Sequence, residues 1–170
     1  NSIHNPYFSN ETKDYVYKAS IEVYDNHISG IFIVKKLGEA NHRILFTTEM
    51  GNKIFDFSLL NDTFKLNYII EDMNKAILIN ILKKDFKALI QEKAPVIKSY
   101  SSHDTLIYET SLSNKKHFYF KTHQLNKIIR VNNGKEKVTL LFLKINDNVA
   151  NQIKILHSNI KLKINLESFN

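Results

Sequence analysis

The feature that most constrains the fold is an amphipathic stretch in the middle of the chain, residues 72–92. Apolar residues recur there at helical spacing, and lysine, asparagine and glutamine occupy the opposite side. Asp72 can cap the start of such a helix, and Pro95 limits its continuation. Because strand-like sequence flanks this stretch on both sides, we predict a helix that lies between two groups of strands.

One residue interrupts the apolar side of this helix. Asp85 falls between Leu82 and Leu89, where its carboxylate must find a partner, reach water or become neutral. We expect it to lie at the edge of the helix and to pair with a nearby lysine.

Alternating apolar and polar residues predict the strands. They are expected at residues 15–24, 28–37, 43–48, 53–59 and 63–70 before the helix, and at 105–109, 117–122, 127–131, 136–145, 152–157 and 160–166 after it. Short connections favour antiparallel pairing, and the sequence Asn132-Asn133-Gly134-Lys135 is the strongest hairpin signal. A sheet of about eleven strands has to curl. The predicted fold is therefore mainly β, a curled antiparallel half-barrel, or open barrel, with the helix on its concave face.

The chain length and composition fit one domain. With 170 residues, 43% of them hydrophobic, the chain can bury a core of ordinary size. Residues 1–14 are polar and irregular, and we expect them to form an N-terminal tether. Residues 15–170 are expected to form the single domain.

Several function classes are disfavoured by composition. The formal charge is +7, but the lysines are scattered and only Arg43 and Arg130 supply guanidinium groups, which argues against nucleic-acid binding. The chain has no cysteine, and its seven histidines are spread singly, so no metal site is expected. No phosphate-binding loop or nucleophile elbow occurs. We expect neither an enzyme nor a cofactor.

A family resemblance rests on the order of motifs before the helix. The sequence Ser29-Gly30-Ile31 is followed by residues 43–51 (RILFTTEMG), then by Phe55-Asp56-Phe57, then by the helix. This order resembles the LolA/LolB superfamily of outer-membrane lipoprotein-localisation proteins. The resemblance implies an open barrel with a helical lid, whose cavity takes the acyl chains of lipoproteins.

The resemblance also implies a cellular setting. It suggests a LolB-like, Bacteroidetes-type lipoprotein at the outer membrane facing the periplasm, anchored through a lipidated cysteine upstream. Its expected partners are acyl chains of lipoproteins or lipids, the membrane surface and a periplasmic LolA-like carrier. We expect a monomer.

Apolar residues on both faces of several strands suggest where a ligand would bind. One apolar set can pack on the helix, while the other can line a cavity, or else pack against loops or a partner. The expected lining of an acyl cavity consists of Ile21, Val23, Ile31, Ile33, Phe46, Phe57, Phe64, Leu66, Leu78, Leu82 and Phe86.

The loop at Met50 and Gly51 is the expected membrane-insertion element. The resemblance places Met50 at the exposed tip of a protruding loop, and a flexible apolar side chain there suits shallow insertion. The alternative is a methionine that folds back onto the sheet. The sequence therefore favours a lipid-binding acceptor or carrier of lipoproteins. The alternative function is a structural or interaction lipoprotein of an envelope complex, with a filled core and no ligand.

Overall fold

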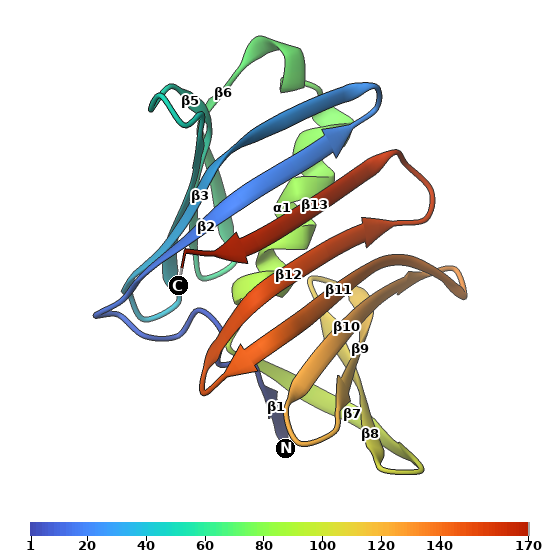
Figure 1. Cartoon of the computed structure of the whole chain (residues 1–170). Helices are drawn as coiled ribbons and strands as arrows, with labels where there is room; N and C mark the ends of the chain where they lie inside the picture. The colour runs from blue at the N-terminus through green and yellow to red at the C-terminus, as the bar shows by residue number, and fades with distance from the viewer. Residues whose placement is uncertain (170) are drawn as a thin grey trace.

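The computed structural model describes residues 1–169, and within them the chain forms one antiparallel sheet of thirteen strands and a helix, α1 (Figure 1). The strands before α1 are β1 (Ser2–His4), β2 (Asp14–Val23), β3 (Asn26–Gly38), β4 (Asn41–Thr47), β5 (Lys53–Leu60) and β6 (Thr63–Ile69). Those after α1 are β7 (Lys93–Ser102), β8 (Thr105–Leu112), β9 (Lys115–Lys121), β10 (Leu125–Asn132), β11 (Lys135–Asn146), β12 (Val149–His157) and β13 (Leu162–Ser168). Asn170, the last residue of the expected domain, lies outside the described residues.

The sheet is built from two meanders that meet in its middle. Its strand order is β1-β7-β8-β9-β10-β11-β12-β13-β2-β3-β4-β5-β6, and every pairing is antiparallel. Pairing of β13 with β2, from Leu162↔Val23 to Ser168↔Tyr17, joins the meanders. Since β1 and β6 lie at opposite ends of this order, the sheet stays open. The predicted open antiparallel sheet with an internal helix is confirmed.

The helix is shorter than predicted at both ends. It runs from Ala76 to Ile90, and its N-cap residue, Lys75, makes no side-chain cap hydrogen bond. The predicted capping by Asp72 is wrong, because Asp72 belongs to a separate 3-10 turn, Glu71–Met73. With 15 residues, α1 covers the inner face of the sheet (Figure 1). Among the described residues, no helix is long and apolar enough to cross a membrane.

The N-terminal residues are part of the fold rather than a tether. Ser2–His4 pairs with residues 93–95 as β1, and Tyr7 and Phe8 are buried. The Tyr7 ring lies 4.7 Å from that of Phe142, between ring centroids, and its hydroxyl donates to the Leu125 carbonyl. We call residues 1–13 the N-terminal strap. The alternation used to predict strands missed it because its burial comes from contacts far along the chain.

The hairpin predicted at residues 132–135 is confirmed. Asn132 pairs with Lys135, and the two residues between them, Asn133 and Gly134, have φ angles of 53° and 73°. Two consecutive residues with positive φ are the requirement of a tight type I′ turn.

Gly30 is required where β3 meets β4. A Cβ atom built on Gly30 would overlap the backbone carbonyl of Thr47, whereas one on Gly38 has no described atom within 4 Å. We expect Gly30→Ala to lower the free energy of unfolding by about 3 kcal/mol or more, because backbone has to shift. Gly38→Ala is expected to change it by less than about 0.5 kcal/mol. Urea titration of both variants measures their free energies of unfolding. Equal losses in the two variants would show that the close approach of β3 and β4 does not require Gly30.

The strap is expected to contribute to global stability. Phe8 is 1% exposed and its ring lies 5.1 Å from that of Tyr15, whereas Phe169 is 61% exposed. Phe8→Ala should therefore cost about 3–5 kcal/mol in chemical unfolding. Phe169→Ala, the matched control, should cost less than about 0.5 kcal/mol. A tether that merely rests on the sheet would give both variants the parental stability.

Candidate functional site

Most of the expected lining residues come together on the inner face of the sheet. Those that lie fully buried in one core beneath α1 are Ile21, Val23, Phe46, Phe57, Leu78, Leu82 and Phe86. Phe64 is half-buried at the edge of this core, with its ring 5.1 Å from that of Phe57, and Leu66, on the edge strand β6, is 37% exposed.

Aromatic rings fill the space beneath the middle of the helix. The Phe86 ring lies 5.5 Å from Phe32, 5.7 Å from Phe55 and 5.9 Å from Phe57, measured between ring centroids. Phe55 and Phe57 stack at 4.6 Å with an interplanar angle of 4°. At these separations the rings are in direct contact. An acyl chain can therefore enter this region only if side chains or α1 itself move.

Ile31 and Ile33 lie on the opposite face, and their expected position beneath the helix is wrong. In β3 the buried residues are Gly30, Phe32 and Val34, and the two isoleucines alternate with them, half-buried on the outer face. The physical reason is the side-chain period of two along a strand.

An apolar pocket of about 350 Å³ opens at the N-terminal end of α1. Its apolar lining consists of Val23, Ile28, Ile54, Ile70, Met73 and Leu78. Its polar and aromatic lining, nearer the solvent, includes Tyr24, Asn26, His27, Thr48, Asn52, Lys53, Asp72 and Lys75. Val23 and Leu78 belong to the expected set, while the others were not predicted. Their common signal, proximity to the chain reversals at residues 24, 48–52 and 70–75, becomes visible only when those turns are placed side by side.

Two exposed apolar side chains belong to segments that line this pocket, Met50 between Thr48 and Asn52 and Ile77 directly before Leu78. Met50, at the tip of the β4–β5 turn, is 90% exposed, and Ile77, in the first turn of α1, is 70% exposed. The Lys75 ammonium lies 5.6 Å from the centre of the Tyr24 ring, on the β2–β3 turn. The exposure of Met50 shows that its side chain points into solvent rather than folding back onto the sheet, and Gly51 after it has a φ of 91°. We call Tyr24, Met50, Lys53, Lys75 and Ile77 the rim.

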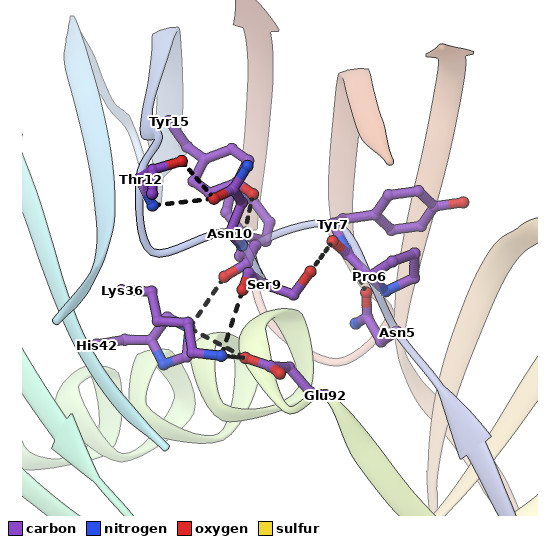
Figure 2. Close-up of polar contacts among 11 residues, drawn as sticks. Asn5, Pro6, Tyr7, Ser9, Asn10, Thr12, Tyr15, Lys36, His42 and Glu92 are labelled. Carbon is purple, nitrogen blue, oxygen red and sulfur yellow. Dashed lines mark hydrogen bonds and ion pairs between the residues drawn. The ribbon is translucent and has the colours of Figure 1, made fainter. Parts of the chain in front are cut away.

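The strap is tied to the other end of the helix, beside a cleft of about 410 Å³ that is lined mainly by polar and charged residues. Figure 2 shows Lys36, His42 and Glu92 gathered against the strap. Lys36 Nζ lies 2.8 Å from Glu92 Oε2 and donates to the Ser9 carbonyl at 3.3 Å, and His42 Nε2 lies 3.1 Å from the Phe8 carbonyl.

Further ties fix the strap to the end of the helix. Asn5 Nδ2 donates to the Leu89 carbonyl at 3.1 Å. Burial lowers the pKa of His42, so this end is held mainly by neutral hydrogen bonds and the Lys36–Glu92 ion pair. The two ends of the helix–sheet interface thus differ: the pocket at the N-terminal end has an apolar lining, whereas the cleft at the C-terminal end is mainly polar and lies beside the strap.

Asp85 is fully buried and its partners come from the sheet, so its expected pairing with a nearby lysine is wrong. Arg130 Nη1 of β10 donates to Asp85 Oδ1 at 3.1 Å, and His157 Nε2 of β12 lies 2.6 Å from Oδ2. His157 Nδ1 in turn lies 2.8 Å from the Leu162 carbonyl. These partners lie 45 and 72 residues away in sequence, which local spacing does not reveal.

His117 extends this polar group across the sheet. It pairs with Arg130 across β9 and β10, it is 2% exposed, and burial lowers its pKa to about 4. Its Nδ1 donates to the Lys115 carbonyl at 2.9 Å. Among the described residues, neither His117 Nε2 nor the buried Tyr119 hydroxyl has a hydrogen-bond partner.

Comparison with known proteins adds a fold relationship. No family model and no curated protein matches the sequence. Among solved structures, the chain is similar to the LolA superfamily protein NE2245 from Nitrosomonas europaea, with a TM-score of 0.56 and 7% identity, over 98% of this chain and 88% of that one. It is also similar to a domain named as an outer membrane lipoprotein-sorting protein from Vibrio parahaemolyticus, with a TM-score of 0.53 and 9% identity, over 96% of this chain and 86% of that one. At such low identity these likenesses establish the fold alone: an open antiparallel sheet with a helix, as in the LolA superfamily.

Proposed function

We propose that this protein binds a lipid acyl chain in the apolar pocket at the N-terminal end of α1, and that it acts in the bacterial envelope as a LolB-like acceptor or carrier of lipoproteins. The observation that carries the proposal is the pocket itself. Its apolar lining, from β2, β3, β5, the 3-10 turn and α1, is continuous with the core beneath the helix. The fold that the chain shares with a LolA superfamily protein and a lipoprotein-sorting domain supports the same class of function.

The size of the pocket suits one chain rather than several. At about 350 Å³ it lies near the lower end of the range for ligand pockets. Burial contributes about 0.8 kcal/mol per methylene, so ten buried methylenes contribute about 8 kcal/mol, from which the cost of association is subtracted. Leu78 belongs both to the pocket lining and to the core. A longer acyl chain would therefore have to displace Leu78 first and then the phenylalanine rings beneath α1.

We propose that the rim contacts the membrane when the bound acyl chain is delivered. Met50 and Ile77 are exposed apolar side chains, and Lys53 and Lys75 beside them favour anionic headgroups by about 1 kcal/mol each near the surface. Docking of this end on a bilayer would bring a competing apolar phase to the pocket mouth. In this proposal the protein lies at the outer membrane facing the periplasm, takes cargo from a LolA-like carrier, and performs no catalysis.

Filling the pocket should weaken acyl binding. Ile28 is half-buried and lines the pocket, whereas Ile160 is half-buried and lines only the neighbouring, more polar cleft, which shares Tyr24, Asn26 and His27 with the pocket. We expect Ile28→Trp to weaken binding of a fluorescent fatty-acid probe by about tenfold or more, because the indole occupies the space of several methylenes. Ile160→Trp, with the same change in size, should retain parental affinity.

The same binding measurement tests the alternative function, an interaction module without a ligand. If the parent protein fails to bind the probe, and mass spectrometry of an organic extract of the purified protein finds no acyl lipid, the lipid-binding proposal is wrong.

Charge at the rim should slow transfer without affecting binding. Met50→Glu adds a carboxylate at a 90% exposed position outside the pocket, so probe affinity should be unchanged. Transfer of bound probe to anionic vesicles should slow several-fold, because the carboxylate must be desolvated and is repelled by the headgroups. Leu37→Glu, at a 53% exposed position at the far end of β3, is the matched control and should transfer at the parental rate. If both variants slowed transfer equally, the proposed role of the rim in membrane transfer would be wrong.

A further inference from the structure

A second hollow, a cleft of about 780 Å³, adjoins the apolar pocket at the same end of the sheet. The β2–β3 turn borders both, because Tyr24, Asn26 and His27 line the cleft as well as the pocket. On its other side the cleft is bordered by the connection between β12 and β13, residues 158–161, which lies at the same end of the sheet as the β2–β3 turn (Figure 1). We call this hollow the turn cleft.

The backbone holds the turn cleft in shape. Tyr24 N donates to the Lys161 carbonyl at 2.8 Å, so the two turns are tied to each other. A row of cross-strand partners crosses the sheet here and consists of Leu156, Lys163, Glu22 and His27. Along the strands this row alternates with the core residues Ile21 and Ile164, which places it on the outer face of the sheet. The turn cleft therefore lies on rigid elements.

The lining of the turn cleft is polar and carries both signs of charge. Lys161 and Lys163 supply two ammonium groups, while Glu22 and Asp25 supply two carboxylates. None of these four side chains takes part in the ion pairs found within residues 1–169. The Asn26 amide adds a donor and an acceptor. A polypeptide backbone presents donors and acceptors together, so such a lining is complementary to it.

An apolar pocket that adjoins a polar cleft matches a ligand with two unlike parts. In an acylated polypeptide, an apolar chain and a polar backbone are joined at one residue, so the polypeptide has to leave the pocket at its mouth. At about 780 Å³ against about 350 Å³, the turn cleft has more than twice the volume of the pocket and lies in the upper part of the range for ligand sites. A small lipid headgroup would fill only part of it, whereas several residues of a polypeptide can occupy it.

We propose that the turn cleft binds the first residues of the polypeptide that carries the acyl chain held in the apolar pocket. The inference rests on the proposed function, because it takes an acylated protein as the ligand. It adds a second point of recognition, at which the polypeptide and not the acyl chain determines the affinity.

Ligands that share one acyl chain test the proposal. The first is a lauroylated pentapeptide amide of serine, asparagine and alanine, and the second is lauroyl-serinamide, which has the same amide bond but no further peptide. In isothermal titration calorimetry, the protein should bind the lauroyl-pentapeptide about tenfold more tightly, the effect of one or two additional hydrogen bonds. A lysophosphatidylethanolamine with the same lauroyl chain, the third ligand, should bind no more tightly than lauroyl-serinamide.

Variants at the turn cleft should remove this difference and leave acyl binding intact. Lys163 is exposed and lines the cleft but not the pocket, so Lys163→Trp places an indole in the cleft alone. This variant should bind both the lauroyl-pentapeptide and lauroyl-serinamide with the parental affinity for lauroyl-serinamide. Ile160→Trp, which narrows the cleft from the β12–β13 connection, should behave in the same way. Lys18→Trp, the same change at an exposed lysine of β2 away from the cleft, is the matched control and should keep the tenfold difference.

The proposal is wrong if the parent protein binds the lauroyl-pentapeptide no more tightly than lauroyl-serinamide, or if Lys163→Trp and Ile160→Trp both keep the tenfold difference. It is also wrong if lysophosphatidylethanolamine shows the same tenfold advantage, because the cleft would then be a headgroup site. In each of these cases acyl binding, and with it the proposed function, would stand. If the parent bound none of the three lauroyl ligands, the proposed function would be rejected together with this inference.

Discussion

The structure depends on covering the inner face of a very wide sheet. Thirteen strands, counted over residues 1–169, would span about 58 Å if flat. The helix α1 has 15 residues and is about 22 Å long. One helix of this size can cover the apolar face only if the sheet curls around it and other segments contribute. The strap supplies Tyr7 and Phe8 at one end, and at the other end the coverage is incomplete and leaves the apolar pocket.

Because of this uneven coverage, the two ends of the helix–sheet interface differ. At its polar end, Lys36, Glu92 and Asn5 join the strap, the sheet and the end of α1. At its open end, the walls are apolar side chains and the turns carry exposed methionine and isoleucine. In between, the buried Asp85 of α1 contacts Arg130 of β10 and His157 of β12, while apolar side chains pack along the rest of the inner side of the helix. Movement of α1 is thus expected to pivot about the strap.

The sequence was sufficient for the local elements and insufficient for the long-range ones. Alternation and turn residues gave eleven of the thirteen strands described in residues 1–169, and helical spacing gave α1. The strands β1 and β7 were missed because β7 is largely polar and exposed and β1 has three residues. The error at Ile31 and Ile33 could have been avoided. A two-residue hairpin turn pairs odd-numbered residues of β2 with even-numbered residues of β3, which places Phe32, not Ile31, beside Tyr17. No local pattern could have connected Asp85 to His157.

The pairing of β13 with β2 has a consequence for how the chain folds. Of the thirteen strands described in residues 1–169, the last in chain order, β13, occupies a central position in the sheet, between β12 and β2. Until Leu162–Ser168 has left the ribosome, β2 presents an unpaired edge and the two meanders remain separate. Contacts between residues so far apart in sequence close slowly. The finished fold is therefore expected to form only once β13 has emerged, and a chain that lacks Leu162–Ser168 would keep the remaining strands of both meanders yet lack the strand that unites them.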